Sequence, residues 1–284
     1  MAFGTREHVF GNTGQFTDDG TWTTGTNWAN GAAPLDGEAV VISDPDFDIA
    51  GFPADPALLQ LSALAIASTC TKKIGTAGVR MNVDCTDTAN GAGVVLFEGA
   101  GETNYFACNA NYFIINHRTY TVNSLFLKHR TTAIGDVWHR DGSATLDGGS
   151  YTRIIMDSKA GASSRLVIDA GSTLAEIICA SGIIECSATD AIATLTMSGG
   201  GIFEHLAVQA ITTLNVWGGF FYFDGLSTIT EINQWGGVVD ASRTTGNKTV
   251  TKYNGHAGRL IPPPGGGLSV DTKNFSSRFD RGGF

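Results

Sequence analysis

The fold of this chain is indicated by two neighbouring stretches, Thr213-Leu-Asn-Val-Trp-Gly-Gly219 and Thr230-Glu-Ile-Asn-Gln-Trp-Gly-Gly237. In each, apolar and polar residues alternate, and a tryptophan precedes a pair of glycines. Side chains at alternate positions of a β-strand point to the same face, and glycine adopts the positive φ of a tight bend without steric cost. Each stretch therefore predicts a short strand that ends in a bend.

The same unit recurs through the middle of the chain. Further copies are Ala144-Thr-Leu-Asp-Gly-Gly149, Arg165-Leu-Val-Ile-Asp-Ala-Gly171, Ile177-Ile-Cys-Ala-Ser-Gly182 and Ala193-Thr-Leu-Thr-Met-Ser-Gly-Gly200. In the four copies nearest the carboxyl terminus, two of which are the stretches quoted first, the first bend residue is Ser181, Gly199, Gly218 and Gly236, with spacings of 18, 19 and 18 residues. This period is shorter than the roughly 30 residues of a βαβ unit, and no intervening stretch has helical periodicity. The repeats predict an all-β protein built as a parallel β-solenoid, with an up-and-down barrel or a sandwich as the structural alternative.

Composition narrows the function classes. The chain has 284 residues, of which 42% are hydrophobic and only 16% charged, with 37 glycines, so it is too apolar for a disordered linker. No apolar run reaches the roughly 18 residues of a membrane span, and the amino terminus lacks the layout of a signal peptide. We expect no membrane partner and no exported adhesin. The five cysteines form no CxxC pair. We therefore expect buried thiols, synthesis in a reducing host cytoplasm, and neither a metal nor a cofactor.

Charge is distributed unevenly along the chain. Residues 1–71 carry nine acidic side chains against one arginine, and residues 166–242 carry eight acidic side chains with no lysine or arginine. Residues 243–284 carry seven basic and two acidic side chains. An acidic body is a poor partner for nucleic acid, because it repels phosphates. A basic carboxyl-terminal segment indicates contact with an acidic surface.

We expect three parts: an N-terminal cap over residues 1–52, the solenoid over 53–261, and an extended carboxyl-terminal arm over 262–284. Capping is expected because a solenoid end exposes unpaired strand edges. Asp55 followed by Pro56 indicates a helix start, although the Leu-Gln-Leu and Leu-Ala-Ile segments that follow equally suit the first solenoid strands. The run Pro262-Pro-Pro-Gly-Gly-Gly267 is expected to end the repeats, because proline cannot donate to a ladder.

The first quarter of the chain resembles a known family. Asn27-Trp28-Ala-Asn-Gly31, followed by Pro34-Leu-Asp-Gly37-Glu-Ala-Val40-Val-Ile42, resembles the N-terminal segment of β-helical virion proteins of tailed phages. Leu61-Ser-Ala-Leu-Ala-Ile66 and Lys73-Ile-Gly75 resemble the strand that follows it. The chain departs from the pattern at Glu38, where aspartate is usual. The resemblance implies a right-handed parallel β-helix, usually a homotrimer, in a head decoration (cement) protein or a tail spike.

The short length and the lack of a recognisable receptor-binding head favour a decoration protein on the outer capsid surface, with the major capsid protein and a second and third copy as partners. The alternative is a tail spike that acts on host surface polysaccharide. Residues expected to contact the partner are Arg259, Lys273, Phe275, Arg278, Phe279, Arg281, Phe284, Trp22 and Trp28. Residues expected on the oligomer face are Trp217, Phe221, Phe223 and Trp235, because about half of the aromatic side chains of a solenoid strand must point outward.

Other patterns indicate specific chemistry only weakly. Asp44-Pro-Asp46-Phe-Asp48 lacks the glycine and the glutamate of a calcium-binding EF-hand loop, so a solvated acidic turn is favoured. His117-Arg118, His129-Arg130 and His139-Arg140 suit either a docking stripe or exposed bends paired with Asp136 and Asp141. The exposed bends are favoured over the docking stripe. A metal site is not expected, because an arginine beside each histidine repels a cation.

Carboxylate pairs are the basis of the enzyme alternative, a polysaccharide depolymerase. Glycosidases need two carboxyl groups about 5–10 Å apart. Candidate pairs are Asp84 with Asp87, Glu98 with Glu102, and Glu185 with Glu204. Residues one coil apart in a solenoid lie about 4.8 Å apart, so such pairs arise by chance. A lyase would also need a lysine or arginine to stabilise its intermediate, and residues 166–242 have none. We therefore expect no catalytic residues.

Overall fold

The computed structural model describes an all-β chain. The described residues are 7–10, 28, 31–43, 48–49, 60–85, 93–99, 104–117, 125–129, 135–159, 161–207 and 209–276. Within them no α-helix occurs, and the one helical turn is the short 3-10 helix η3 (Gly161–Ser163). The chain divides into two compact units, residues 1–150 and 151–284.

The first unit stacks parallel strands in two sheets. One sheet has the order β1-β2-β3-β5-β7-β9, and the other has the order β4-β6-β8-β10. The strands are β1 (Glu7–Phe10), β2 (Ala39–Ile42), β3 (Ala63–Ile66), β4 (Met81–Cys85), β5 (Val94–Phe97), β6 (Asn104–Ala110), β7 (Tyr112–Asn116), β8 (Leu125–His129), β9 (Asp136–Asp141) and β10 (Ser143–Leu146). Of the two alternatives for the segment after Pro56, strand is confirmed for Ala63–Ile66, which forms β3, and Gln60 makes an isolated parallel bridge to Asp84.

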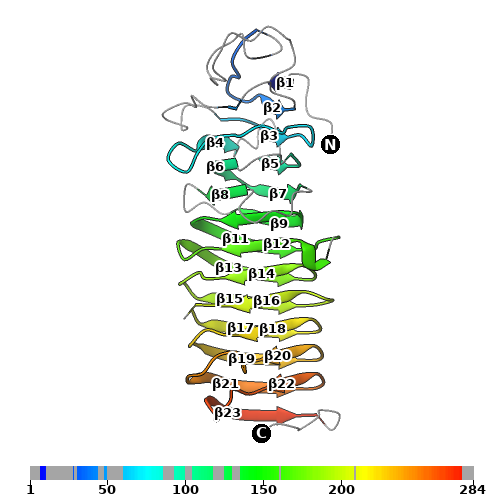
Figure 1. Cartoon of the computed structure of the whole chain (residues 1–284), viewed down its shortest axis with the longest axis vertical. Helices are drawn as coiled ribbons and strands as arrows, with labels where there is room; N and C mark the ends of the chain where they lie inside the picture. Colours follow the sequence, from blue (N-terminus) through cyan, green and yellow to red (C-terminus); the bar gives the residue numbers. More distant parts are fainter. Residues whose placement is uncertain are drawn as a thin grey trace. The chain divides into compact units, whose positions relative to one another are not determined.

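The second unit repeats the arrangement with greater regularity, as the ladder of labelled strands in Figure 1 shows. Its sheets have the orders β11-β13-β15-β17-β19-β21-β23 and β12-β14-β16-β18-β20-β22, and the registers are parallel. The strands of the first sheet, in which β11 crosses the boundary between the units, are β11 (Gly149–Met156), β13 (Ser172–Cys179), β15 (Ile192–Met197), β17 (Ile211–Val216), β19 (Thr228–Gln234), β21 (Lys248–Gly255) and β23 (Leu268–Phe275). Those of the second sheet are β12 (Arg165–Ile168), β14 (Ile183–Cys186), β16 (Ile202–His205), β18 (Phe220–Phe223), β20 (Val238–Asp240) and β22 (Arg259–Ile261).

These stacked coils form a β-solenoid, which confirms the predicted fold class. From β3 onward, consecutive strands of one sheet are separated along the chain by a strand of the other sheet, so each repeat contributes one rung to both sheets. The predicted period recurs in the pairing: Leu195 lies beside Leu214, and Leu214 beside Ile232. All three are fully buried. Equivalent residues of successive repeats therefore stack in the interior, as the alternating pattern predicts.

Buried polar side chains in the second unit are tied to the bends. Gln234 is fully buried, and its Nε2 donates to the carbonyl oxygens of Gly236, Gly237 and Arg259 at 3.2, 3.1 and 3.0 Å. Its Oε1 accepts a hydrogen bond of 2.6 Å from the Tyr253 hydroxyl. Because both ends of this amide are satisfied, Gln234 connects two bends without the cost of an unpaired buried polar group.

A ladder of asparagines runs along the outer face of the sheet that contains β17. The Nδ2 atom of each asparagine donates to the Oδ1 atom of the preceding one, from Asn233 to Asn215 at 3.1 Å, from Asn254 to Asn233 at 2.7 Å and from Asn274 to Asn254 at 2.8 Å. Such ladders need identical side chains in exact lateral register, which the parallel pairing provides.

Two segments differ in role from the expected division of the chain. Ala39–Ile42, in the expected cap, forms β2 and pairs with both β1 and β3. Leu268–Phe275, in the expected arm, forms β23 and pairs with β21 from Leu268 to Phe275. The edge of β21 offers a row of unpaired backbone groups, and an eight-residue strand satisfies them. Residues 277–284 lie outside the described part of the chain.

The five cysteines are free and buried, as expected. Burial raises the pKa of the Cys179 thiol to about 12 and that of Cys186 to about 11, so these thiols stay protonated and unreactive at neutral pH. Among the described residues, no helix is long and apolar enough to span a membrane.

Candidate interaction surface

The outer face of one sheet of the second unit carries an apolar stripe. We define this stripe by four residues that stand in register on successive strands, namely Ile183, Ile202, Phe220 and Val238. Each directly follows a bend glycine, and each is the first residue of its strand that points outward. Phe220 is 44% exposed, and Arg165 and Arg259 continue the row at its two ends. The residue after each glycine is thus a repeated outward position, and it is apolar in four consecutive coils.

A second row runs beside the stripe, two residues further along each strand. It consists of Glu185, Glu204, Tyr222 and Asp240, again in register. Three of the four side chains are acidic, which places much of the charge of the arginine-free segment on this face. Stacked carboxylates repel one another, so the row needs cations from elsewhere in the chain.

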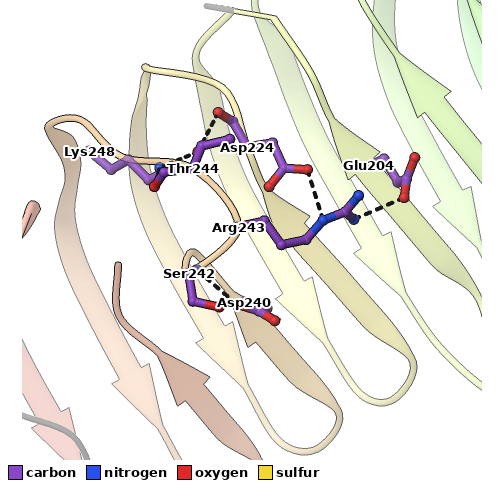
Figure 2. A network of polar contacts seen from close by, with 7 residues as sticks. All are labelled: Glu204, Asp224, Asp240, Ser242, Arg243, Thr244 and Lys248. Atoms are coloured by element: carbon purple, nitrogen blue, oxygen red, sulfur yellow. Dashed lines mark hydrogen bonds and ion pairs between the residues drawn. The ribbon is translucent and has the colours of Figure 1, made fainter. Parts of the chain in front are cut away.

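Arginines from other segments provide those cations. Figure 2 shows Arg243, from the loop after β20, between Glu204 and Asp224. Its Nη1 donates to Glu204 Oε1 at 2.9 Å, and its Nε lies 3.5 Å from Asp224 Oδ2. The guanidinium carbon lies 4.2 Å from the centroid of the Tyr222 ring, a cation–π contact. Arg165 forms an ion pair with Glu185 in the same way.

The pKa shifts in this network are those expected of ion pairs and hydrogen bonds within the chain. The hydrogen bond to Glu204 raises the pKa of Arg243. Burial raises the pKa of Asp224, and the nearby Arg243 acts in the opposite direction. Asp240 accepts hydrogen bonds from the backbone N–H and the hydroxyl of Ser242, at 2.8 and 2.6 Å. Glu185 and Glu204 are therefore ion-paired and Asp240 is hydrogen-bonded within the chain, so the row offers no pair of free carboxyl groups.

A buried lysine anchors the same loop from inside. Lys248 is fully buried, and its Nζ donates to the hydroxyl and the carbonyl oxygen of Thr244 at 2.8 and 3.2 Å (Figure 2). It lies 5.8 Å from the centroid of the Phe223 ring. Burial lowers the pKa of Lys248, with Asp224 opposing the shift. Because no part of this side chain reaches solvent, its role is to hold the loop rather than to react with a substrate.

An aromatic corner adjoins the apolar stripe across the bend. We define it by Trp217, Trp235 and His256, which stack on consecutive coils. The two indole rings are 4.1 Å apart and 8° from parallel, and the His256 ring follows at 5.5 Å and 5°. Trp217 is 56% exposed. Only the Gly218-Gly219 pair separates Trp217 from Phe220, so the corner and the stripe form two sides of one edge.

The expected oligomer face is only partly at the surface. Trp217 and Trp235 point outward, but Phe221 and Phe223 are buried inside the coil. The assignment of these two phenylalanines to the face is wrong, because the strand alternates from Phe220 and its parity places the second and fourth aromatic residues inward.

The expected partner contacts have mixed placements. Trp28 is buried, so its side chain is not available to a partner. Arg259 is exposed in β22, and Lys273 and Phe275 lie in β23. The remaining expected contacts, Trp22, Arg278, Phe279, Arg281 and Phe284, lie outside the described residues.

Of the three histidines in the His-Arg pairs, the two whose side chains are described do not lie on exposed bends. His117 and His139 are fully buried, and burial lowers the pKa of His117 to about 4 and that of His139 to about 3. The local His-Arg pattern suggested exposure, but both histidines occupy inward positions of their coils. Arg118, Arg130 and the side chain of His129 are not described.

Candidate metal and catalytic groups give no centre within the described residues. No cluster of three or more histidine, cysteine or acidic side chains suited to a metal is found there. Asp48 accepts a hydrogen bond of 3.0 Å from the backbone N–H of Lys73, whereas residues 44–47 are not described. Glu185 and Glu204 do stand side by side, but each is bound by an arginine. Asp87 and Glu102 lie outside the described residues.

The apolar stripe was not among the surfaces predicted from the sequence. Its signal was present, because Ile183, Ile202, Phe220 and Val238 each follow a bend glycine. Comparisons with protein-family models, with curated proteins and with solved structures found no match. The proposal for function is therefore based on the surface of the second unit.

Proposed function

We propose that this protein is a structural virion subunit, a homotrimeric capsid decoration protein that binds the outer surface of a phage head. Two features support the proposal. The N-terminal segment resembles that of β-helical phage proteins, and the second unit carries an apolar stripe and an exposed aromatic corner. The single observation that carries it is this surface, because an apolar row on successive coils suits contact with other protein subunits.

The proposed action is mechanical. A decoration protein that binds only the assembled shell stabilises the shell by mass action, in proportion to the logarithm of its free concentration over its dissociation constant. The polar groups of the acidic row are already paired within the chain, so contacts with the major capsid protein fall to other residues. The basic carboxyl-terminal segment, with Arg259, Lys273, Arg278 and Arg281, is the proposed contact with an acidic shell surface.

The test is binding to heads that lack the protein. Purified full-length chain is mixed with such heads, and sedimentation and electron microscopy measure the bound copies and their positions. We expect three-fold protrusions and an increase in the temperature at which the heads open. The double variant Arg278→Glu/Arg281→Glu should weaken binding. Thr212→Asp, at an exposed position in β17, should not. Absence of binding by the wild-type chain would contradict the proposal.

The second candidate is a tail spike that binds or cleaves host polysaccharide. One observation favours it: the indole of Trp217 is exposed, and an exposed aromatic ring suits stacking against a sugar. Against cleavage stand the arginines that occupy Glu185 and Glu204. Purified protein spotted on a lawn of host cells separates the candidates, because a depolymerase produces a halo and a decoration protein produces none.

A further inference from the structure

We infer that the chain associates with its own copies through one seam, in which the aromatic corner of one copy packs on the apolar stripe of the next. This inference rests on the homotrimer part of the proposed function and names the surfaces that would form it. It uses the second unit alone, where both surfaces are described.

The first argument is the repeat distance. Neighbouring strands of a sheet lie about 4.8 Å apart, so the four stripe residues form a straight row roughly 14 Å long. A partner that interdigitates with the whole row must present side chains at the same spacing. An α-helix does not, because its turns repeat every 5.4 Å or so. A second solenoid with the same coils does. The corner residues directly follow Val216, Gln234 and Gly255, which are paired in register on successive strands. Their rings lie 4.1 and 5.5 Å apart, an average step of about 4.8 Å.

The second argument is charge. The acidic row lies directly beside the stripe, and Arg165 and Arg243 form ion pairs with its two glutamates. A partner that supplied many positive charges would compete with these arginines for the same carboxylates. An uncharged aromatic row does not compete, and it leaves the paired acids at the solvated rim. The seam would then have an apolar centre and a polar rim, as protein interfaces generally do.

The third argument is area. Six strands with about four residues each give the outer face a flat footprint of roughly 24 by 13 Å, or about 300 Å². A stable two-partner interface buries about 800 Å² on each side, so a pair joined by this face alone would be weak. In a closed ring each copy uses its stripe toward one neighbour and its corner toward the other. The area buried by each copy then roughly doubles, which favours a ring over a pair.

The first experiment measures the mass of the full-length chain by sedimentation velocity over a range of concentrations. We expect a closed oligomer for the wild type. Phe220→Asp, in the stripe, and Trp217→Asp, in the corner, should each raise the dissociation constant at least 100-fold, since each places a charge in the apolar centre. Thr212 is an exposed residue near the start of β17, at the opposite end of that strand from Trp217 and outside both the corner and the stripe. Thr212→Asp should therefore leave the oligomer intact.

Circular dichroism shows whether each variant folds, and Ile202→Asp replaces Phe220→Asp if the latter does not. A monomeric wild type, or a folded stripe variant with wild-type mass, would overturn the seam. An oligomer that fails to bind heads would contradict the decoration role and still support the seam.

The second experiment tests which surface meets which. Phe220→Cys and Trp217→Cys chains are unfolded, mixed, refolded and oxidised, with the wild type as the control for the buried native cysteines. Corner-on-stripe packing predicts disulfide-linked pairs that contain one chain of each kind. Pairs formed only between identical chains would instead place each surface against itself and would overturn this arrangement.

Discussion

The glycine bends allow a quantitative test of how tightly the coils stack. Gly237 has a φ of 63°, and a Cβ atom there would lie 2.7 Å from both the carbonyl carbon of Gly218 and the carbonyl oxygen of Gly219. These atoms belong to the backbone of the preceding coil, so they cannot rotate away. Gly265 has a φ of 81° but faces open space, with nothing within 4 Å. Alanine substitution at the two positions therefore separates backbone strain from close packing.

The expected magnitudes follow from these two environments. An L-residue in the left-handed region costs about 1–2 kcal/mol, and loss of flexibility in the unfolded chain returns about 0.4–1 kcal/mol of that. Gly265→Ala should therefore lower the free energy of unfolding by about 0.5–1 kcal/mol. Gly237→Ala carries the same strain and also forces two coils apart, which adds the roughly 1–3 kcal/mol of an overpacked interior. Its total loss should be about 1.5–4 kcal/mol.

The assay is denaturant unfolding followed by circular dichroism, with variants compared at equal slope. Gly200→Ala is the matched control, because Gly200 has no positive φ and open space around its Cβ position. It should change the free energy of unfolding by less than about 0.5 kcal/mol. Equal losses at Gly237 and Gly265 would refute the argument, since they would show that the coils yield without cost at this bend.

Two further predictions concern the interior and the polar face. Burial lowers the pKa of His205 to about 4, whereas an unfolded histidine titrates near 6.5. The unfolded chain therefore binds more protons between these values, and the free energy of unfolding should fall as the pH drops from 6.5 to 4, by about 3 kcal/mol from this residue. Unfolding measured across that range should show a shallower dependence on pH for His205→Asn than for the wild type; equal slopes would contradict the shift. Separately, Asn233→Ala removes the central rung of the asparagine ladder and its bonds to Asn215 and Asn254. It should cost about 1–2 kcal/mol in denaturant unfolding, against little for Thr213→Ala in the adjacent outward row, and a loss no greater than that of the control would show that the ladder adds no stability.

Local sequence was enough to predict the solenoid. The alternation in segments such as Thr213–Val216 depends only on the geometry of a single strand, and a glycine pair marks a bend wherever it occurs. Their recurrence at 18 or 19 residues then required that each repeat bury its apolar side against the next. The buried cysteines were predicted on a different basis, since the chain has five cysteines and no CxxC pair.

The parity of the alternation was not visible at Phe220–Phe223, where four aromatic residues follow one another. Which two of them face outward depends on the residue at which the chain leaves the bend and enters the sheet, and on the partner strands β16 and β20. The wrong assignment of Phe221 and Phe223 and the missed stripe both follow from this. Likewise, nothing near Leu268 in the sequence distinguishes a free arm from the strand β23, because the deciding partner is the edge of β21.

Contacts between distant residues required the tertiary structure. Arg243 neutralises Glu204 and Asp224 although it belongs to a later coil, and His117 is buried although its neighbours in sequence suggested an exposed bend. A one-dimensional pattern specifies which faces a strand can present, since that depends on neighbouring residues. The coil stacked beside the strand determines which of these faces is buried and which charged side chains form ion pairs.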